Sequence, residues 1–96
     1  MRHRYLVCYD VCDPGRLDRV YKKMNGFGTP VQYSVFMCDL SPKERVLLES
    51  ELTALTNLRE DRVLIVDLGP TEGRGEDCFV MMGKPRQFPT RGPVVV

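Results

Sequence analysis

The chain has 96 residues, of which 43% are hydrophobic and 28% charged, and its formal net charge at pH 7 is +1. This length suits one compact domain and is too short for two, and the balanced charge gives no overall electrostatic reason to expect a nucleic-acid or membrane partner. No run approaches the roughly 18 apolar residues of a membrane span, and the first apolar run is too short for a signal sequence, so we expect a cytoplasmic protein.

The first predicted elements are a strand and a helix. Residues 4–10, RYLVCYD, form a nearly apolar run, which belongs in the middle of a sheet or under cover on both sides. Asp13 then predicts a helix N-cap, with Pro14 at the first helical position. Asn25-Gly26 ends this helix, since glycine accepts the left-handed cap conformation. The apolar face of the helix is formed by Leu17, Val20, Tyr21 and Met24.

Residues 31–40, VQYSVFMCDL, are rich in β-branched and aromatic side chains and predict strand structure. The segment is long for one strand, yet no Asn-Gly or Asp-Gly divides it. Either one long bent strand or two short strands with an irregular turn would fit. Tyr33 and Phe36 are expected on strand structure, where aromatic side chains typically belong to a core or an interface.

A second helix is predicted at Ser41-Pro42-Lys43-Glu44, which has the residues of a capping box and a proline at the first helical position. Its core stripe consists of Leu48, Leu52 and Leu55, widened by Val46 and Leu47. Residues 61–70 predict another apolar strand, and residues 71–77 an exposed glycine-rich loop. Residues 78–83 predict a short strand, and residues 84–96 an extended tail because they contain three prolines.

This order of elements predicts an α+β fold. Two helices that alternate with four or five strands indicate helices on one face of a sheet, which is the ferredoxin-like arrangement. Because the predicted strands are apolar on both faces, the sheet face without helices needs cover. We therefore infer a homodimer packed sheet to sheet.

Asp10 is the first candidate functional residue, because it follows a buried strand at the point where the chain emerges. Such a carboxylate either binds a metal or takes part in catalysis, or it is simply a solvated group that caps the turn. Asp13 is explained by helix capping. One aspartate alone makes a poor Mg²⁺ site, but two copies of Asp10 across a dimer axis would supply a second carboxylate.

Arg16, Arg19 and Lys23 form a basic stripe on the first helix, away from its apolar face. The stripe is either a solvated helix face or a surface that follows a phosphate backbone. Arg16 lies one helical turn from Asp10, where a cation would hold a phosphate beside a metal ion.

The four cysteines show no CxxC pair and no histidine at a spacing typical of zinc sites. We expect Cys8, Cys38 and Cys78 to pack as small hydrophobic residues, because they lie within apolar runs. Cys12 is different, since it lies in the turn beside Asp10 and is expected to be accessible.

Three stretches together resemble the CRISPR-associated protein 2 family of small dimeric proteins with a nuclease fold. They are YDVCDPGR at 9–16, VQYSVFMCDLSP at 31–42 and DRVLIVDLGP at 61–70. The resemblance implies a ferredoxin-like βαββαβ domain over residues 1–84, with both helices on one face and two strands within 30–40. It also implies a homodimer in which residues 85–96 add a C-terminal strand to the partner subunit's sheet.

The resemblance further implies an Mg²⁺-dependent endonuclease of the CRISPR antiviral system that cleaves RNA or DNA and takes part in spacer acquisition. Asp10 matches the family's metal-binding catalytic aspartate. Arg16 and Phe36 match positions implicated in activity or nucleic-acid contact, and Arg19 would help to hold the backbone. The alternative is a non-catalytic adaptor that bridges the spacer integrase, CRISPR-associated protein 1, and holds the incoming DNA. A third hypothesis is a regulatory module that binds a small ligand.

Overall fold

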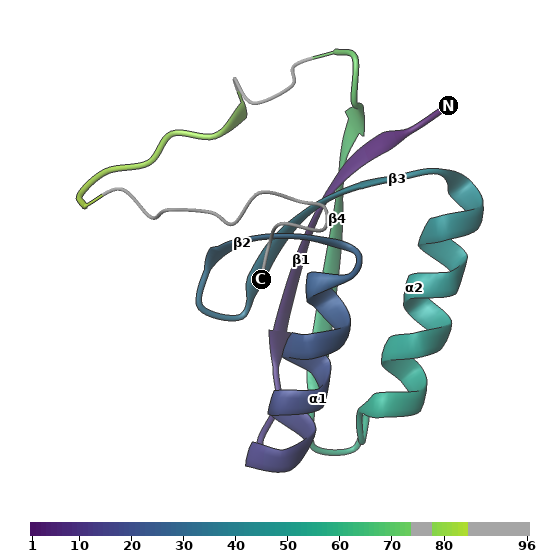
Figure 1. The fold of residues 1–96 in the computed structure, drawn as a ribbon, viewed down its shortest axis with the longest axis vertical. Helices are drawn as coiled ribbons and strands as arrows, with labels where there is room; N and C mark the ends of the chain where they lie inside the picture. The colour runs from purple at the N-terminus through teal and green to yellow at the C-terminus, as the bar shows by residue number, and fades with distance from the viewer. Residues whose placement is uncertain (74–77, 85–96) are drawn as a thin grey trace.

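The computed structural model describes residues 1–73 and 78–84 of the chain. Its elements are β1 (His3–Asp10), α1 (Pro14–Asn25), β2 (Gly28–Gln32), β3 (Val35–Leu40), α2 (Pro42–Leu55) and β4 (Arg62–Pro70). The four strands form one antiparallel sheet in the order β2-β3-β1-β4, and both helices lie on the same face of it (Figure 1). The predicted ferredoxin-like α+β fold is confirmed.

The hydrophobic core lies between the two helices and the sheet face that they cover. Side chains alternate along β1, so that Tyr5, Val7 and Tyr9 point into this core and none is more than 7% exposed. The other elements contribute Val11, Val20, Met24, Phe36, Cys38, Leu40, Leu48 and Leu52. Close packing around Tyr9 fixes the end of β1, and with it the turn that follows.

α1 begins as predicted, but it ends for a different reason. The Asp13 side chain accepts a hydrogen bond from the backbone N–H of Arg16 at 2.8 Å, which confirms Asp13 as the N-cap. At the other end Gly26 has φ -82° and ψ -14°, so the predicted left-handed cap is wrong. Glycine is needed instead at Gly28, where an added Cβ would overlap the β3 backbone at Met37.

Residues 28–40 form a β-hairpin, so the alternative of two short strands is confirmed. Gln32 and Val35 are paired, and Tyr33 and Ser34 form the turn between them. Ser34 has φ 61°, the left-handed conformation that a tight hairpin requires. Tyr33 thus lies in the turn and not on a strand, and it is 78% exposed.

α2 has the predicted capping box, with hydrogen bonds in both directions between Ser41 and Glu44. Leu48 lies on the face of α2 that packs against the sheet and is fully buried. Val46 and Leu47, however, are 61% and 53% exposed, so the prediction that they widen the core stripe is wrong. Residues one and two positions before Leu48 are rotated by about 100° and 200° around the helix axis, away from the core.

The segment after β4 differs from its prediction. Residues 78–84 contain no strand, so the short strand expected at 78–83 is wrong, and Val80 and Met82 are 89% and 93% exposed. A strand needs a neighbouring strand to pair with, and the sheet of the described chain consists of β1 to β4 alone. The extended segment expected at 85–96 lies outside the described residues. Within the described ranges, no helix is long and apolar enough to cross a membrane.

The second face of the sheet carries no helix. Leu6 lies there between Met37 and Val66 in the register of the neighbouring strands, and Cys8 lies opposite Leu64. Leu64 is 59% exposed, and the other four are partly buried. The middle of this helix-free face is apolar, as the strand pattern indicated. Its burial against a second copy stays a prediction, because one chain is described.

Candidate functional site

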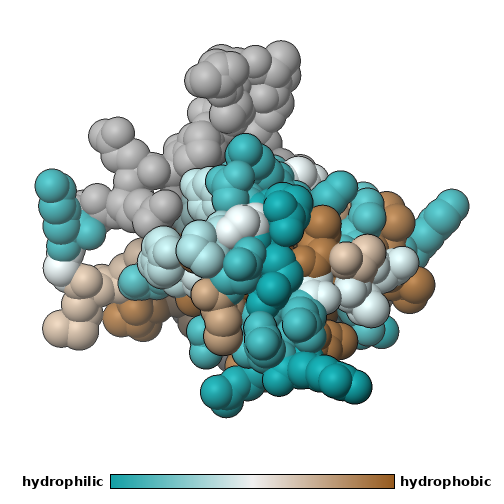
Figure 2. Space-filling view, turned by 90° about the horizontal axis from the view of Figure 1, so that it is seen from below, coloured by the Kyte–Doolittle hydropathy of each residue, from teal (hydrophilic) through white to brown (hydrophobic). Residues whose placement is uncertain are grey.

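Asp10 is the last residue of β1 and is exposed, opposite Arg62 of β4 in the strand register. It lies in an open hollow whose rim also includes Leu58 and Leu64. No hydrogen bond or ion pair joins its carboxylate to any residue in the described ranges. This end of the molecule, where β1 stops and α1 starts, presents a largely hydrophilic surface (Figure 2). Asp10 is therefore accessible from solvent, and its role as a metal ligand stays a prediction.

The turn behind Asp10 is held by Asp61, a residue that sequence reasoning did not single out. The Asp61 side chain is completely buried. It accepts hydrogen bonds from the backbone N–H of Cys12 at 3.0 Å and of Asn57 at 2.8 Å. It also accepts two from Arg16, through Nε at 2.8 Å and Nη2 at 3.1 Å. One carboxylate thus joins the β1–α1 turn, the first turn of α1 and the loop before β4.

Arg16 is bound within the protein and does not project freely into solvent. Besides Asp61 it contacts Glu60, with Nη2 to Oε1 at 3.2 Å, and its side chain is 20% exposed. The hydrogen bonds from Arg16 hold the pKa of the Asp61 carboxyl well below its ordinary value, and the pKa of Arg16 is raised chiefly by the same contact. Both groups therefore stay charged, and Nη1 of Arg16 keeps no partner among the described residues.

The rest of the basic stripe is divided between paired and free cations. Lys23 contacts Glu51 of α2 with Nζ to Oε1 at 3.3 Å, so the stripe partly faces the second helix. Arg19 is exposed and makes no ion pair with any residue that the structure describes. Of the two arginines predicted to contact nucleic acid, Arg19 is thus the more accessible.

Phe36 was predicted to contact nucleic acid, but it is fully buried in the core. Its ring stacks on Tyr9 at 6.2 Å between centroids and meets Tyr21 edge-on at 5.7 Å. No part of Phe36 reaches the surface of the single chain, so its side chain is not accessible to nucleic acid in this structure. Its structural role is to support the rings of Tyr9 and Tyr21.

The described cysteines behave largely as predicted. Cys12 is exposed, and its thiol donates a hydrogen bond to the backbone carbonyl of Glu60 at 3.1 Å. Cys38 is buried, whereas Cys8 and Cys78 are partly buried. The accessible thiol therefore lies in the turn beside Asp10.

The side chains around Asp10 offer a divalent cation part of the ligand set that it needs. In the described ranges no three side chains of the His, Cys, Asp or Glu type cluster closely enough to form a complete metal site. Mg²⁺, however, is commonly bound by one or two carboxylates together with substrate phosphates and waters. The unpaired, exposed Asp10 carboxylate fits one such ligand position, whereas Asp61 is already occupied by Arg16.

Comparison with known proteins gives the family. The model of a family described as CRISPR associated protein Cas2 matches residues 1–74. The CRISPR-associated endoribonuclease Cas2 1 of Rhodospirillum rubrum is 46% identical over 70 residues, which cover 73% of this chain and 69% of that protein. The CRISPR-associated endoribonuclease Cas2 of Geobacter sulfurreducens is 43% identical over 72 residues, which cover 75% of this chain and 76% of that protein.

Solved structures agree with this result. The crystal structure of Streptococcus pyogenes Cas2 is similar with a TM-score of 0.74 and 30% identity, covering 83% of this chain and 99% of that one. A hypothetical protein from Thermus thermophilus has a TM-score of 0.77 at 23% identity, covering 92% of this chain and 99% of that one, which shows a shared fold. Since the family model spans most of the chain and includes the Asp10 turn, the chain belongs to the CRISPR-associated Cas2 family.

Proposed function

We propose that two copies of this chain form a metal-dependent endonuclease that hydrolyses phosphodiester bonds in RNA, with DNA as the alternative substrate. The carrying observation is the exposed Asp10 carboxylate, free of intramolecular partners in the described chain, in a member of a family whose relatives are named endoribonucleases. We further propose that the protein is cytoplasmic and takes part in spacer acquisition by the CRISPR system.

In this proposal Asp10 of each subunit provides a carboxylate ligand for Mg²⁺. When bound, Mg²⁺ supplies Lewis-acid polarisation of the phosphoryl group that is attacked. The pairing of two copies matters because a single described chain offers one unoccupied carboxylate at this turn. Asp61 holds the Asp10 turn by accepting from the backbone N–H of Cys12, and Asp13 caps the helix that follows the turn.

The cations of α1 would position the nucleic-acid backbone. Arg19 is exposed and has no carboxylate partner in the described chain, so it can pair with a phosphate without breaking an existing contact. Arg16 would contribute through Nη1 while Nε and Nη2 stay on Asp61. Arg19 therefore gives the cleaner test of phosphate binding, because charge reversal at Arg16 would also leave Asp61 buried without its cation.

The test is cleavage of labelled single-stranded RNA and double-stranded DNA by wild type and Asp10→Ala, with Mg²⁺ or with EDTA. We expect Asp10→Ala to lower the rate by on the order of 100-fold or more, the loss typical of removing a group that stabilises charge in the transition state. EDTA should abolish cleavage by the wild type. The substrate lanes identify whether RNA or DNA is cut.

A matched control is Glu49→Ala, which removes an exposed carboxylate of α2 that pairs with Arg45. This variant should cleave at the wild-type rate. Cleavage that continues unchanged in Asp10→Ala, or in EDTA, would contradict the proposal and indicate another site or a contaminating nuclease.

A second candidate function rests on a different observation. No histidine, lysine or second acid among the described residues is hydrogen-bonded or ion-paired to Asp10, and the Asp61 carboxylate in the same hollow is held by Arg16, so no general base is evident beside it. The rival proposal is a non-catalytic dimeric adaptor that bridges the spacer integrase, CRISPR-associated protein 1, and holds the incoming DNA. It predicts that Asp10→Ala leaves spacer acquisition intact, whereas Arg19→Glu abolishes it.

A further inference from the structure

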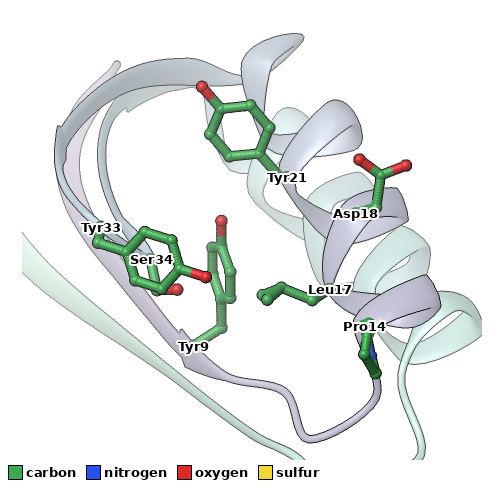
Figure 3. Close-up of a pocket in the computed structure, with 7 residues that line it drawn as sticks. All are labelled: Tyr9, Pro14, Leu17, Asp18, Tyr21, Tyr33 and Ser34. Carbon is green, nitrogen blue, oxygen red and sulfur yellow. The ribbon is translucent and has the colours of Figure 1, made fainter.

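A pocket of about 370 Å³ lies between α1 and the turn that joins β2 to β3 (Figure 3). We call it the tyrosine pocket, and its main lining residues are Tyr9, Leu17, Asp18, Tyr21, Tyr33 and Ser34. Asp10 does not line it. The nuclease proposal gives this pocket no role.

Three aromatic rings surround the pocket and differ in how much of each is exposed. Tyr9 is 6% exposed, Tyr21 42% and Tyr33 78%. Figure 3 shows Tyr9 between Tyr33 on the hairpin side and Leu17 on the helix side, with Tyr21 farther along the helix. Large aromatic surfaces left open beside a cavity are typical of ligand and partner sites.

The walls of the pocket are fixed by the core behind it. Phe36 contacts the rings of both Tyr9 and Tyr21, so these two rings are held from within the protein. The backbone N–H of Tyr9 donates to the carbonyl of Ser34 at 3.1 Å, which ties the hairpin turn to β1. Tyr33 is therefore presented from an anchored turn, while its side chain stays free to meet a ligand.

Asp18 is the charged residue among those that line the pocket. Its Oδ2 contacts Nζ of Lys22 at 3.0 Å, and both side chains are more than half exposed. Oδ1 makes no hydrogen bond or ion pair with the described residues. An ionised carboxylate only accepts hydrogen bonds, so this rim favours a ligand that presents N–H donors.

A nucleobase combines the required properties. Its flat ring stacks on tyrosine irrespective of sequence, and such stacking is the usual way in which unpaired bases are bound. The exocyclic amino groups of adenine, cytosine and guanine are donors that suit Asp18. Uracil and thymine carry a carbonyl oxygen where cytosine carries its amino group, so they offer the carboxylate a ring N–H but no exocyclic donor.

We propose that the tyrosine pocket binds one unpaired nucleobase that carries an exocyclic amino group, stacked on Tyr33 and hydrogen-bonded to Asp18. The inference rests on the proposed function in one respect, since the base comes from the nucleic acid that the protein acts on or holds. A base in this pocket would fix the position of the strand along α1, where Arg19 and Lys22 are exposed.

The test is the affinity of labelled single-stranded hexanucleotides, measured by fluorescence anisotropy in EDTA with strand length checked afterwards. Oligo-A, oligo-C and oligo-U are compared as RNA, and oligo-A, oligo-C and oligo-T as DNA. We expect Tyr33→Ala to weaken binding of oligo-A by roughly tenfold, the scale of one lost stacking contact, and Tyr33→Phe to bind like wild type. Leu47→Ala, which trims an exposed side chain on α2, is the matched control.

Two further readouts make the result specific. The chain has four tyrosines and no tryptophan, so stacking of a base should quench the intrinsic tyrosine emission, and Tyr33→Ala should remove much of that quenching. Asp18→Asn should narrow the preference for oligo-A over oligo-U, because an amide can donate to a carbonyl as well as accept.

The outcomes are separable from those of the nuclease test. Equal affinity of wild type and Tyr33→Ala overturns the pocket proposal, whatever the cleavage assay shows. Suppose that wild type binds oligo-A more tightly than oligo-U, that Tyr33→Ala loses this difference, and that neither wild type nor any variant cleaves nucleic acid. This result supports the pocket proposal and rejects the nuclease proposal. A change in self-association in Tyr33→Ala, with unchanged affinity for oligonucleotides, also overturns the proposal by showing that the pocket receives protein.

Discussion

Asp61 joins parts of the chain that lie far apart in the sequence. Its carboxylate accepts hydrogen bonds from Arg16, 45 residues away, and from the backbone of Cys12 and Asn57. Removing one partner from a buried ion pair leaves the other charge without compensation, which is usually far more costly than losing a surface pair. The position of the Asp10 turn therefore depends on a residue that takes no part in the proposed chemistry.

We expect Asp61→Asn to lower the melting temperature by roughly 5 °C or more, because Arg16 loses its buried charged partner and keeps only the exposed Glu60. Since pairing lowers the pKa of the Asp61 carboxyl, its contribution is fully present above the ordinary aspartate pKa of about 3.9 and is lost as the pH falls below that value. The difference between wild type and variant should thus shrink in acid. Thermal melts by circular dichroism from pH 7 to pH 3 would measure it.

The control for this prediction is Glu49→Gln, which breaks the exposed pair with Arg45 and should change the melting temperature little. A difference between wild type and Asp61→Asn that stays constant down to pH 3 would show that the ion pair is not its cause.

Local and long-range signals explain which site residues could be predicted. Asp10 and Asp13 were identified because a strand end and a helix cap are each recognisable within a few residues. The partnership of Arg16 with Asp61 was missed, since no local pattern links two residues 45 positions apart. Phe36 was placed on a strand correctly, but only the folded chain shows that its ring faces inward.

The ends of helices and strands were also predictable where the signal lies in adjacent residues. The starts of α1 and α2 were predicted because Asp13-Pro14 and Ser41-Pro42 carry their capping signals in adjacent residues. The end of α1 was located correctly for the wrong reason, since Gly26 is right-handed. The glycine that the fold requires is Gly28, where β2 approaches β3 too closely for a side chain.

We expect Gly28→Ala to destabilise the protein by about 1–3 kcal/mol, the usual cost of forcing an extra carbon into a packed region. The added Cβ would overlap the Met37 carbonyl oxygen and the Cys38 sulfur. Gly26→Ala should instead change stability by no more than about 1 kcal/mol, since alanine readily adopts its conformation. Urea unfolding of the two variants measures both values, and equal losses would contradict this interpretation.

At the scale of the whole molecule, the helix-free face of the sheet is the main unexplained surface. Leu6, Cys8 and Leu64 lie on it, and Leu64 is more than half exposed. The order of elements predicted the ferredoxin-like fold because each connection is short and each helix has one apolar side. The sequence of one chain does not identify what covers the helix-free face, because this depends on contacts with another molecule.

We expect wild type to be dimeric and Leu64→Arg to shift it towards monomer by at least tenfold in dissociation constant, because a charge would be buried between two sheets. Sedimentation velocity over a range of concentrations measures this shift, and far-ultraviolet circular dichroism checks that the variant is folded. Leu47→Arg, on the exposed side of α2, serves as the comparison and should stay dimeric. A wild type that is monomeric at every concentration would reject the dimer.

The carboxylate of Asp61 has a consequence for how the loops of this molecule open. The amides of Cys12 and Asn57 donate to that side chain and not to a backbone carbonyl, although they belong to different loops. Both protons should therefore exchange slowly with deuterated water and with the same protection factor, because release of a single side chain exposes both amides. Equal protection of these two amides would give the free energy of opening the turn that carries Asp10.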